Sequence, residues 1–163
     1  MKIFLFLLLL FSAPAFAVSS SVSDYASAQQ CYRSLDKSSA KGFGHCQHLF
    51  ERVMKKYPGT AQARKSLFSI ARLAEAKNDL TKDDKDLEQA LKTYNQYLRE
   101  NPKDSMADDC LYQISKIRLE KMNDREKALR ALTAIVERYP NGDRVEAASK
   151  DLKRLQNDLK RLH

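Results

Sequence analysis

The sequence predicts an all-α fold, an array of three helix pairs closed by a terminal helix. Three prolines carry this prediction, because Pro58, Pro102 and Pro140 each follow a short run with helical spacing of apolar residues. Proline cannot continue a helix and also restricts the residue before it, so each one marks a corner between two helices. A helix breaker that recurs at intervals indicates a repeat. We find no segment with a clear strand pattern.

Aligning the chain on these prolines places the same kinds of apolar residue in each unit. A small residue stands early in each run, and bulky residues follow at steps of three and four, which are helical steps. The aligned sets are Cys46, Ala90 and Ala128; Phe50, Tyr94 and Leu132; Val53, Tyr97 and Ile135; Ala63, Ala107 and Val145; Ile70, Ile114 and Leu152; and Leu73, Ile117 and Leu155.

These patterns predict seven helices with short connections. We expect them at about residues 22–37, 45–57, 60–78, 84–100, 103–122, 124–139 and 142–162. Thr60, Ser105 and Asp143 are the expected N-terminal caps, since their side-chain oxygens can accept from free backbone N–H groups. The polar stretch 78–86 is expected to be an inserted linker, with its acidic residues 83–86 solvated.

The N-terminus has the features of a secretory signal peptide. Lys2 precedes an unbroken apolar run, and Ala15 and Ala17 stand before the expected cleavage point. The prediction is therefore a leader at 1–17 and one repeat domain at 18–163, exported to the periplasm or secreted. Beyond the leader no stretch approaches the ~18 apolar residues of a membrane-spanning helix, so we expect no transmembrane segment after its removal.

The chain is basic, with 29 Lys and Arg against 21 Asp and Glu and a net charge of +8. Removal of Lys2 with the leader would lower the net charge to +7. This surplus favours acidic partners or anionic surfaces, or serves solubility alone. We expect no nucleic-acid partner, because the basic residues form no compact block and an exported protein rarely meets nucleic acid.

The early small residue, the bulky residue four positions later, the closing proline and first helices of the form Leu67-x-x-Ile70-Ala71 resemble a tetratricopeptide repeat (TPR) protein. The likeness covers about residues 24–162, although the prolines are unequally spaced. The Tyr-Pro corner before an alanine-rich helix is similar to TPR regions of bacterial envelope proteins. These are outer-membrane assembly lipoproteins, the Tol-Pal coordination protein and the regions preceding some N-acetylmuramoyl-L-alanine amidases.

The resemblance implies that the first helix of each pair lines a concave face that binds a partner segment. Two of these helices each carry an aromatic residue and, four positions on, a cation on the same helix face. The expected binding residues are Lys65, Phe68, Arg72, Tyr112 and Lys116, and the expected ligand is an acidic or C-terminal peptide. The alternative is that the aromatics belong to the core and the cations to the solvated surface.

Three cysteines leave two pairing states open. In an oxidising compartment Cys31 and Cys46 could form a disulfide across the polar loop between them, or all three could remain thiols. Cys110 aligns with small residues and is expected to be a buried free thiol. His45 and His48 beside Cys46 suggest a metal site, but closed zinc sites need four ligands, so we expect no metal and no cofactor.

The last predicted helix carries an apolar seam with heptad spacing at Val145, Ala148, Leu152, Leu155, Leu159 and Leu162. The favoured interpretation is a capping helix that covers the last repeat. The alternative is that Leu159 and Leu162 extend beyond the domain and mediate self-association.

Together these features predict an exported TPR scaffold or adaptor that binds a protein segment in an outer-membrane or peptidoglycan-related assembly. We expect no enzyme, because the sequence lacks a nucleophile–base pattern and a glycine-rich phosphate loop. One alternative is a non-catalytic binder of anionic envelope polymer, peptidoglycan or lipopolysaccharide. Another is a stand-alone helical partner of a cell-wall amidase.

Overall fold

The computed structural model describes residues 15–36 and 38–161. Its helices are α1 (Ala15–Arg33), α2 (Phe43–Lys56), α3 (Ala61–Thr81), α4 (Asp84–Glu100), α5 (Ala107–Lys116), the π-helix η1 (Ile117–Lys121), α6 (Arg125–Arg138) and α7 (Val145–Lys160). Over this described part of the chain there is no strand, and no helix has the length and apolar character to cross a membrane. Most of the predicted leader, residues 1–14, lies outside the described residues.

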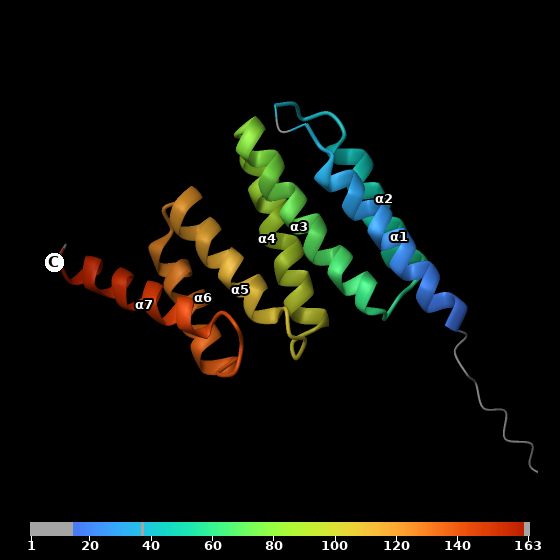
Figure 1. Cartoon of the computed structure of the whole chain (residues 1–163). Helices are drawn as coiled ribbons and strands as arrows, with labels where there is room; N and C mark the ends of the chain where they lie inside the picture. Colours follow the sequence, from blue (N-terminus) through green and yellow to red (C-terminus); the bar gives the residue numbers. More distant parts are fainter. Residues whose placement is uncertain (1–14, 37, 162–163) are drawn as a thin grey trace, which may run out of the picture.

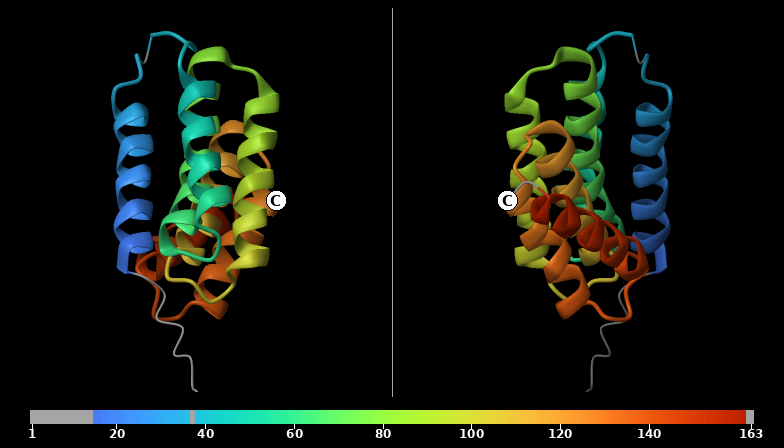
Figure 2. Two further views of the ribbon diagram at one scale, coloured as in Figure 1. Left: turned by 90° about the vertical axis from the view of Figure 1, so that its right-hand side faces the viewer. Right: turned by 90° about the vertical axis from the view of Figure 1, so that its left-hand side faces the viewer.

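Successive helix pairs stack side by side along the chain. The pairs α1–α2, α3–α4 and α5–α6 follow one another, and α7 covers the last of them (Figure 1). Figure 2 shows α1 and α4 on opposite sides of α2 and α3. This arrangement confirms the predicted all-α, TPR-like solenoid of three helix pairs and a terminal helix.

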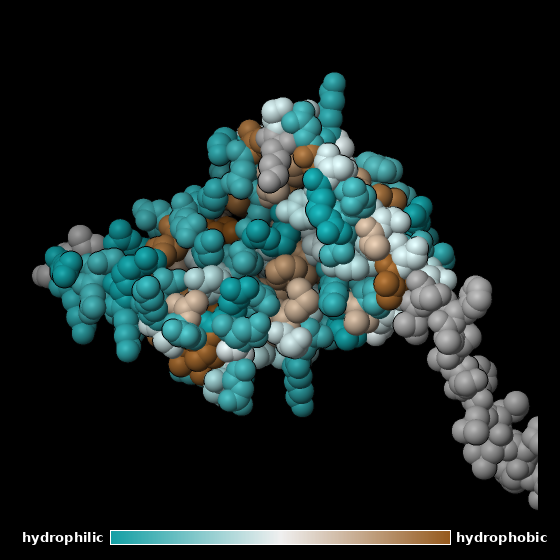
Figure 3. Space-filling view, viewed as in Figure 1, coloured by the Kyte–Doolittle hydropathy of each residue, from teal (hydrophilic) through white to brown (hydrophobic). Residues whose placement is uncertain are grey.

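Within the described residues, the core consists of three clusters along the stack. One lies around Phe50 at α1, α2 and α3, one around Tyr94 at α3, α4 and α5, and one around Leu132 at α6 and α7. The aligned small residues are fully buried: Cys46, Ala90 and Ala128 are each 0% exposed. Hydrophilic residues cover most of the face seen in Figure 1 (Figure 3).

Tyrosine hydroxyls hold the proline corners. Tyr57 Oη donates to Asp24 at 2.8 Å, and Tyr139 Oη donates to the carbonyl of Pro102 at 2.9 Å. The partners lie 33 and 37 residues apart in the sequence. The first bond ties the corner after α2 to α1 of the same pair, and the second ties the corner after α6 to the corner after α4.

The caps are only partly as predicted. Thr60 accepts a hydrogen bond from the first turn of α3, but Ser105 and Asp143 cap no helix. Instead, Asp104 accepts at 3.0 Å from the backbone N–H just before α5. Asp108, from the preceding repeat, accepts at 3.0 Å from the backbone N–H just before α7.

A glycine permits the second of these contacts. A β-carbon at Gly142 would stand 2.2 Å from Asp108 Oδ2, and Asp108 itself is only 2% exposed. The glycine of the Pro-Asn-Gly corner is therefore required by close approach to a buried carboxylate.

The prediction of an inserted linker at 78–86 is wrong, because only two of these residues separate α3 from α4. The side chain of Asn78 donates to the carbonyl of Asp83 at 2.9 Å, and Asp83 caps α4. Asp86, expected to be solvated, is buried and accepts from Lys77 at 2.7 Å. These local bonds satisfy the polar groups and allow both helices to continue to a tight turn.

The first and fifth helices also differ from the prediction at their ends. The first begins at Ala15, within the predicted leader, and not at about residue 22. The first helix ends at Arg33 because Asp36 accepts from the backbone N–H of Ser38 at 2.8 Å and starts a turn. The fifth changes from α5 to η1, where the N–H of Met122 donates to the carbonyl of Ile117 at 3.1 Å. Apolar spacing alone does not reveal such a change in helix type.

Candidate functional site

A cleft of about 610 Å³ lies between α1 and α3 and contains three of the five predicted binding residues. Lys65, Phe68 and Arg72 line it from α3. Four residues of α1 form the facing wall, and the turn before α5 adds one more: Tyr25, Gln29, Tyr32, Arg33 and Met106. We call this the α1–α3 cleft.

Aromatic rings line the cleft and also contact the core. Phe68 is half-buried and packs edge-on against Tyr94, with ring centroids 5.5 Å apart and an interplanar angle of 63°. Tyr25 packs against Phe50 with centroids 5.9 Å apart, and its hydroxyl lies 3.4 Å from Ser69 Oγ. Phe68 therefore both packs on the core and lines the cleft.

The charged residues of the cleft are all cationic. Arg33 and Lys65 are exposed, and neither forms an ion pair with any described residue. The third cation, Arg72, donates to Glu75 at 3.1 Å and to Gln113 at 3.0 Å. Arg33 and Lys65 are thus the cations available to an anionic ligand, whereas Arg72 is held by its neighbours.

Arg72 also lines a second, smaller cavity of about 230 Å³ between α3 and α5, which contains the predicted residue Lys116. We call this the α3–α5 cavity. Glu75 also lines this cavity and accepts hydrogen bonds from both Arg72 and the buried Tyr94 hydroxyl. Burial raises the pKa of Glu75, and burial together with the neighbouring Glu75 raises the pKa of Tyr94.

Tyr112 lies apart from the other four predicted residues and lines neither cavity. Its hydroxyl donates to Asp151 of α7 at 2.9 Å, and the guanidinium of Arg144 lies over its ring at 5.6 Å from the centroid. The two aromatic–cation pairs therefore do not form the one groove that the sequence had led us to expect. Tyr112 belongs to the junction between α5 and α7.

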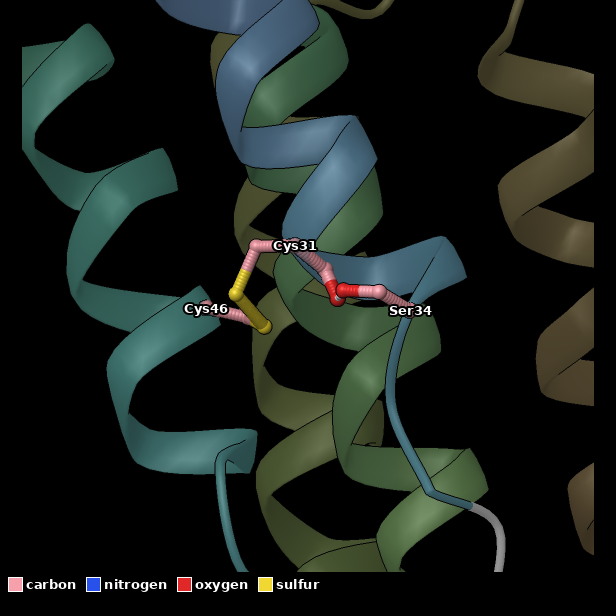
Figure 4. The surroundings of a disulfide bond; sticks show 3 residues. All are labelled: Cys31, Ser34 and Cys46. Carbon is pink, nitrogen blue, oxygen red and sulfur yellow. Dashed lines mark hydrogen bonds between the residues drawn. A yellow bond between two sulfur atoms is a disulfide. The ribbon is translucent and has the colours of Figure 1, made fainter.

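A disulfide joins the wall of the cleft to the next helix. Cys31 on α1 and Cys46 on α2 are bonded, with their Cα atoms 5.5 Å apart, and Ser34 Oγ donates to the carbonyl of Cys31 at 3.0 Å (Figure 4). Cys110 is a buried free thiol, and burial raises its pKa. The disulfide thus restrains α1, which supplies half of the cleft.

The disulfide bears on the metal hypothesis as well. The sulfur atoms of Cys31 and Cys46 are bonded to each other, so neither cysteine can offer a thiolate ligand beside His45 and His48. Across residues 15–36 and 38–161, no three His, Cys, Asp or Glu side chains are grouped so that they could hold a metal ion.

The cleft residues on α1 were missed by sequence reasoning. The proline that precedes this helix, Pro14, falls within the predicted leader, so it did not serve as a fixed point for the alignment. A usable signal existed nevertheless. Tyr25 precedes Phe68 by almost the same interval that separates Phe68 from Tyr112.

The terminal helix α7 packs with Val145, Ala148, Leu152 and Leu155 in the third core cluster. Leu159 is half-buried, and Leu162 lies outside the described residues. This packing agrees with a capping role. Self-association through Leu159 and Leu162 stays a prediction.

Residues 109–142 match the family model described as tetratricopeptide repeat. The chain carries a TPR. The match runs from the first turn of α5 to the glycine of the corner after α6, which is one complete helix pair. No curated protein matches the chain. In this TPR α5 is the first helix, and its counterparts α1 and α3 are the two helices that form the cleft.

Proposed function

We propose that this protein is an exported, non-catalytic adaptor that binds an acidic protein segment of a cell-envelope assembly in the α1–α3 cleft. The observation that carries the proposal is the cleft itself, on the first helices of a TPR-type array. It combines aromatic rings with two cations that form no ion pair within residues 15–36 and 38–161. TPR arrays typically bind partner segments on such a surface.

The chemistry of the cleft favours a protein segment that is both apolar and acidic. Phe68 and Tyr25 offer apolar contact area that is already held in place by core rings, so little side-chain entropy is lost on binding. Arg33 and Lys65 would then orient the segment through its carboxylates. No covalent step is required of the protein in this role.

Two features support export. The N-terminal sequence has the composition of a secretory leader, and a disulfide persists most readily in an oxidising compartment. The periplasm of a Gram-negative cell meets both conditions. The envelope assembly as the place of action rests on the resemblance to envelope TPR proteins.

A crosslinking pull-down from envelopes, with the tagged mature chain, tests the proposal. The informative variant is Arg33→Glu with Lys65→Glu, because both side chains are exposed and neither has an ion-pair partner in the described part of the chain. Arg72 is left intact, since its removal would unpair Glu75. The matched control reverses two exposed lysines outside the cleft, Lys92→Glu with Lys153→Glu.

We expect one protein to be recovered by the wild type and the control and to be lost with the cleft variant. Recovery of that protein by the cleft variant would contradict the proposed site. Recovery of a cell-wall amidase would identify the chain as its helical partner.

The net charge of +8 favours one second candidate, the binding of an anionic envelope polymer. Peptidoglycan or lipopolysaccharide would bind through charges spread over the surface. Binding of that kind should weaken steeply with ionic strength and should fall equally in the cleft variant and its control.

A further inference from the structure

The α3–α5 cavity carries six charged residues, and four of them are already paired. Arg72 donates to Glu75 at 3.1 Å, and Lys121 donates to Asp79 at 2.6 Å. The first pair lies within α3, and the second joins η1 to α3; together the four residues carry no net charge.

The two remaining charges are opposite in sign and unpaired. Lys116 and Glu120 both line the cavity and are exposed, and neither forms an ion pair with another described residue. They stand four positions apart, at the end of α5 and in η1, so their side chains emerge one helical turn apart. Among the described residues, the cavity therefore presents one cation and one carboxylate that form no ion pair, although Lys116 acts electrostatically on Glu75 and Glu120 on Lys121.

The helix changes type at this point. Ile117, Glu120 and Lys121 line the cavity and belong to the π-helix η1. This turn ends the helix, because Met122 is its C-cap and Asn123 follows with a φ of 51°. The helix therefore ends at the cavity, beside Lys116 and Glu120.

We propose that the α3–α5 cavity binds a zwitterionic amino-acid centre, with the carboxylate on Lys116 and the ammonium on Glu120. A simple anion would face the carboxylate of Glu120, and a simple cation would face the ammonium of Lys116. Only a ligand with both charges on neighbouring atoms satisfies both side chains. The volume of about 230 Å³ suits such a small group.

This site does not depend on the proposed adaptor function. It uses neither Arg33 nor Lys65, and its ligand is a small chemical group. The centre could belong to a free amino acid or to the end of a side chain on a larger molecule. These two sources share one chemistry and are separated by the choice of probe.

Two isomeric probes test the proposal by NMR titration of the ¹⁵N-labelled mature protein. Nε-acetyl-lysine has its ammonium and carboxylate on one carbon, whereas Nα-acetyl-lysine has the same two charges far apart. We expect saturable shifts in α3 and η1 with the first probe, and an affinity at least about tenfold weaker with the second. L-alanine, which represents a free amino acid, should also bind. Tighter binding of alanine would indicate a free amino acid as the ligand, and tighter binding of Nε-acetyl-lysine would indicate the end of a longer side chain.

Lys116→Gln and Glu120→Gln should each weaken binding of Nε-acetyl-lysine by about tenfold, and Lys92→Gln should leave it unchanged. Both cavity residues are exposed, so the fold should persist, and the amide spectrum of each variant verifies this. The proposal is overturned if the two isomers bind equally, if no probe saturates, or if both cavity variants bind as the wild type does.

Discussion

Removal of the Cys31–Cys46 disulfide should lower the free energy of unfolding by about 3 kcal/mol. The bonded residues are 15 positions apart. In the chain-entropy model, a closed loop of about this length stabilises the folded state by roughly 3 kcal/mol at 25 °C. Alanine is the suitable replacement at Cys46, because alanine occupies the same buried position at Ala90 and Ala128 in the other repeats.

Urea unfolding at 25 °C measures this difference for oxidised wild type, reduced wild type and the variant Cys31→Ala with Cys46→Ala. Reductant should destabilise the wild type and leave the double variant unchanged, which serves as the control. Hydrogen exchange should show the largest loss of protection in α1, the helix that the bond restrains. Equal stability of the oxidised wild type and the double variant, within about 0.5 kcal/mol, would refute the reasoning.

Three further changes test the packing. Gly142→Ala should lower the free energy of unfolding by about 1–3 kcal/mol, since its β-carbon would meet a buried carboxylate. Gly44→Ala, whose β-carbon meets nothing within 4 Å, should raise the free energy of unfolding by up to about 1 kcal/mol. Equal changes in the melting temperatures of the two glycine variants would contradict this difference. Tyr94→Phe should cost about 1–3 kcal/mol, because Glu75 loses a buried donor, and an unchanged urea midpoint would oppose that account. Burial acts to raise the pKa of Asp104, but hydrogen bonds from a tyrosine, a backbone N–H and an arginine outweigh it and lower the pKa below 3.8. Its contribution to stability is therefore present above about pH 4 and is lost as the pH falls through the lower, folded-state pKa. In Asp104→Asn, the free energy of unfolding should accordingly fall less steeply with decreasing pH than in the wild type. An identical pH dependence of the two proteins below about pH 4 would be evidence against this role.

The fold could be predicted from the sequence because its determinants are periodic. Pro58, Pro102 and Pro140 mark the corners, and the small residues that precede them are buried where the alignment places them. These positions make the same contacts in every repeat. The sequence therefore shows the same helix-pair pattern three times, which makes the pattern recognisable.

The candidate site could be predicted only in part, because it depends on what each helix meets in its neighbour. Phe68 and Tyr112 occupy equivalent positions, yet Phe68 lines the cleft while Tyr112 bonds to Asp151. The difference arises from α7, whose Asp151 and Arg144 reach the Tyr112 side chain. No local pattern on α5 reveals that neighbour.

The helix ends were misjudged for a related reason. Asp104 and Asp108 accept from the backbone N–H groups just before α5 and α7. Ser105 and Asp143, which have the stronger local cap signal, cap neither helix. The change to η1 likewise leaves the apolar spacing intact. Backbone bonds of this kind are set by packing.

The most direct test of the central claim is photocrosslinking in living cells from within the α1–α3 cleft. A benzoyl-phenylalanine in place of Phe68 keeps an aromatic ring at the site, and the same group in place of Lys92 provides the control on an exposed surface. We expect one protein to be captured from position 68 through an acidic segment, and not from position 92. Equal capture from both positions, or capture of polymer alone, would contradict the assignment of the cleft as a protein-binding site.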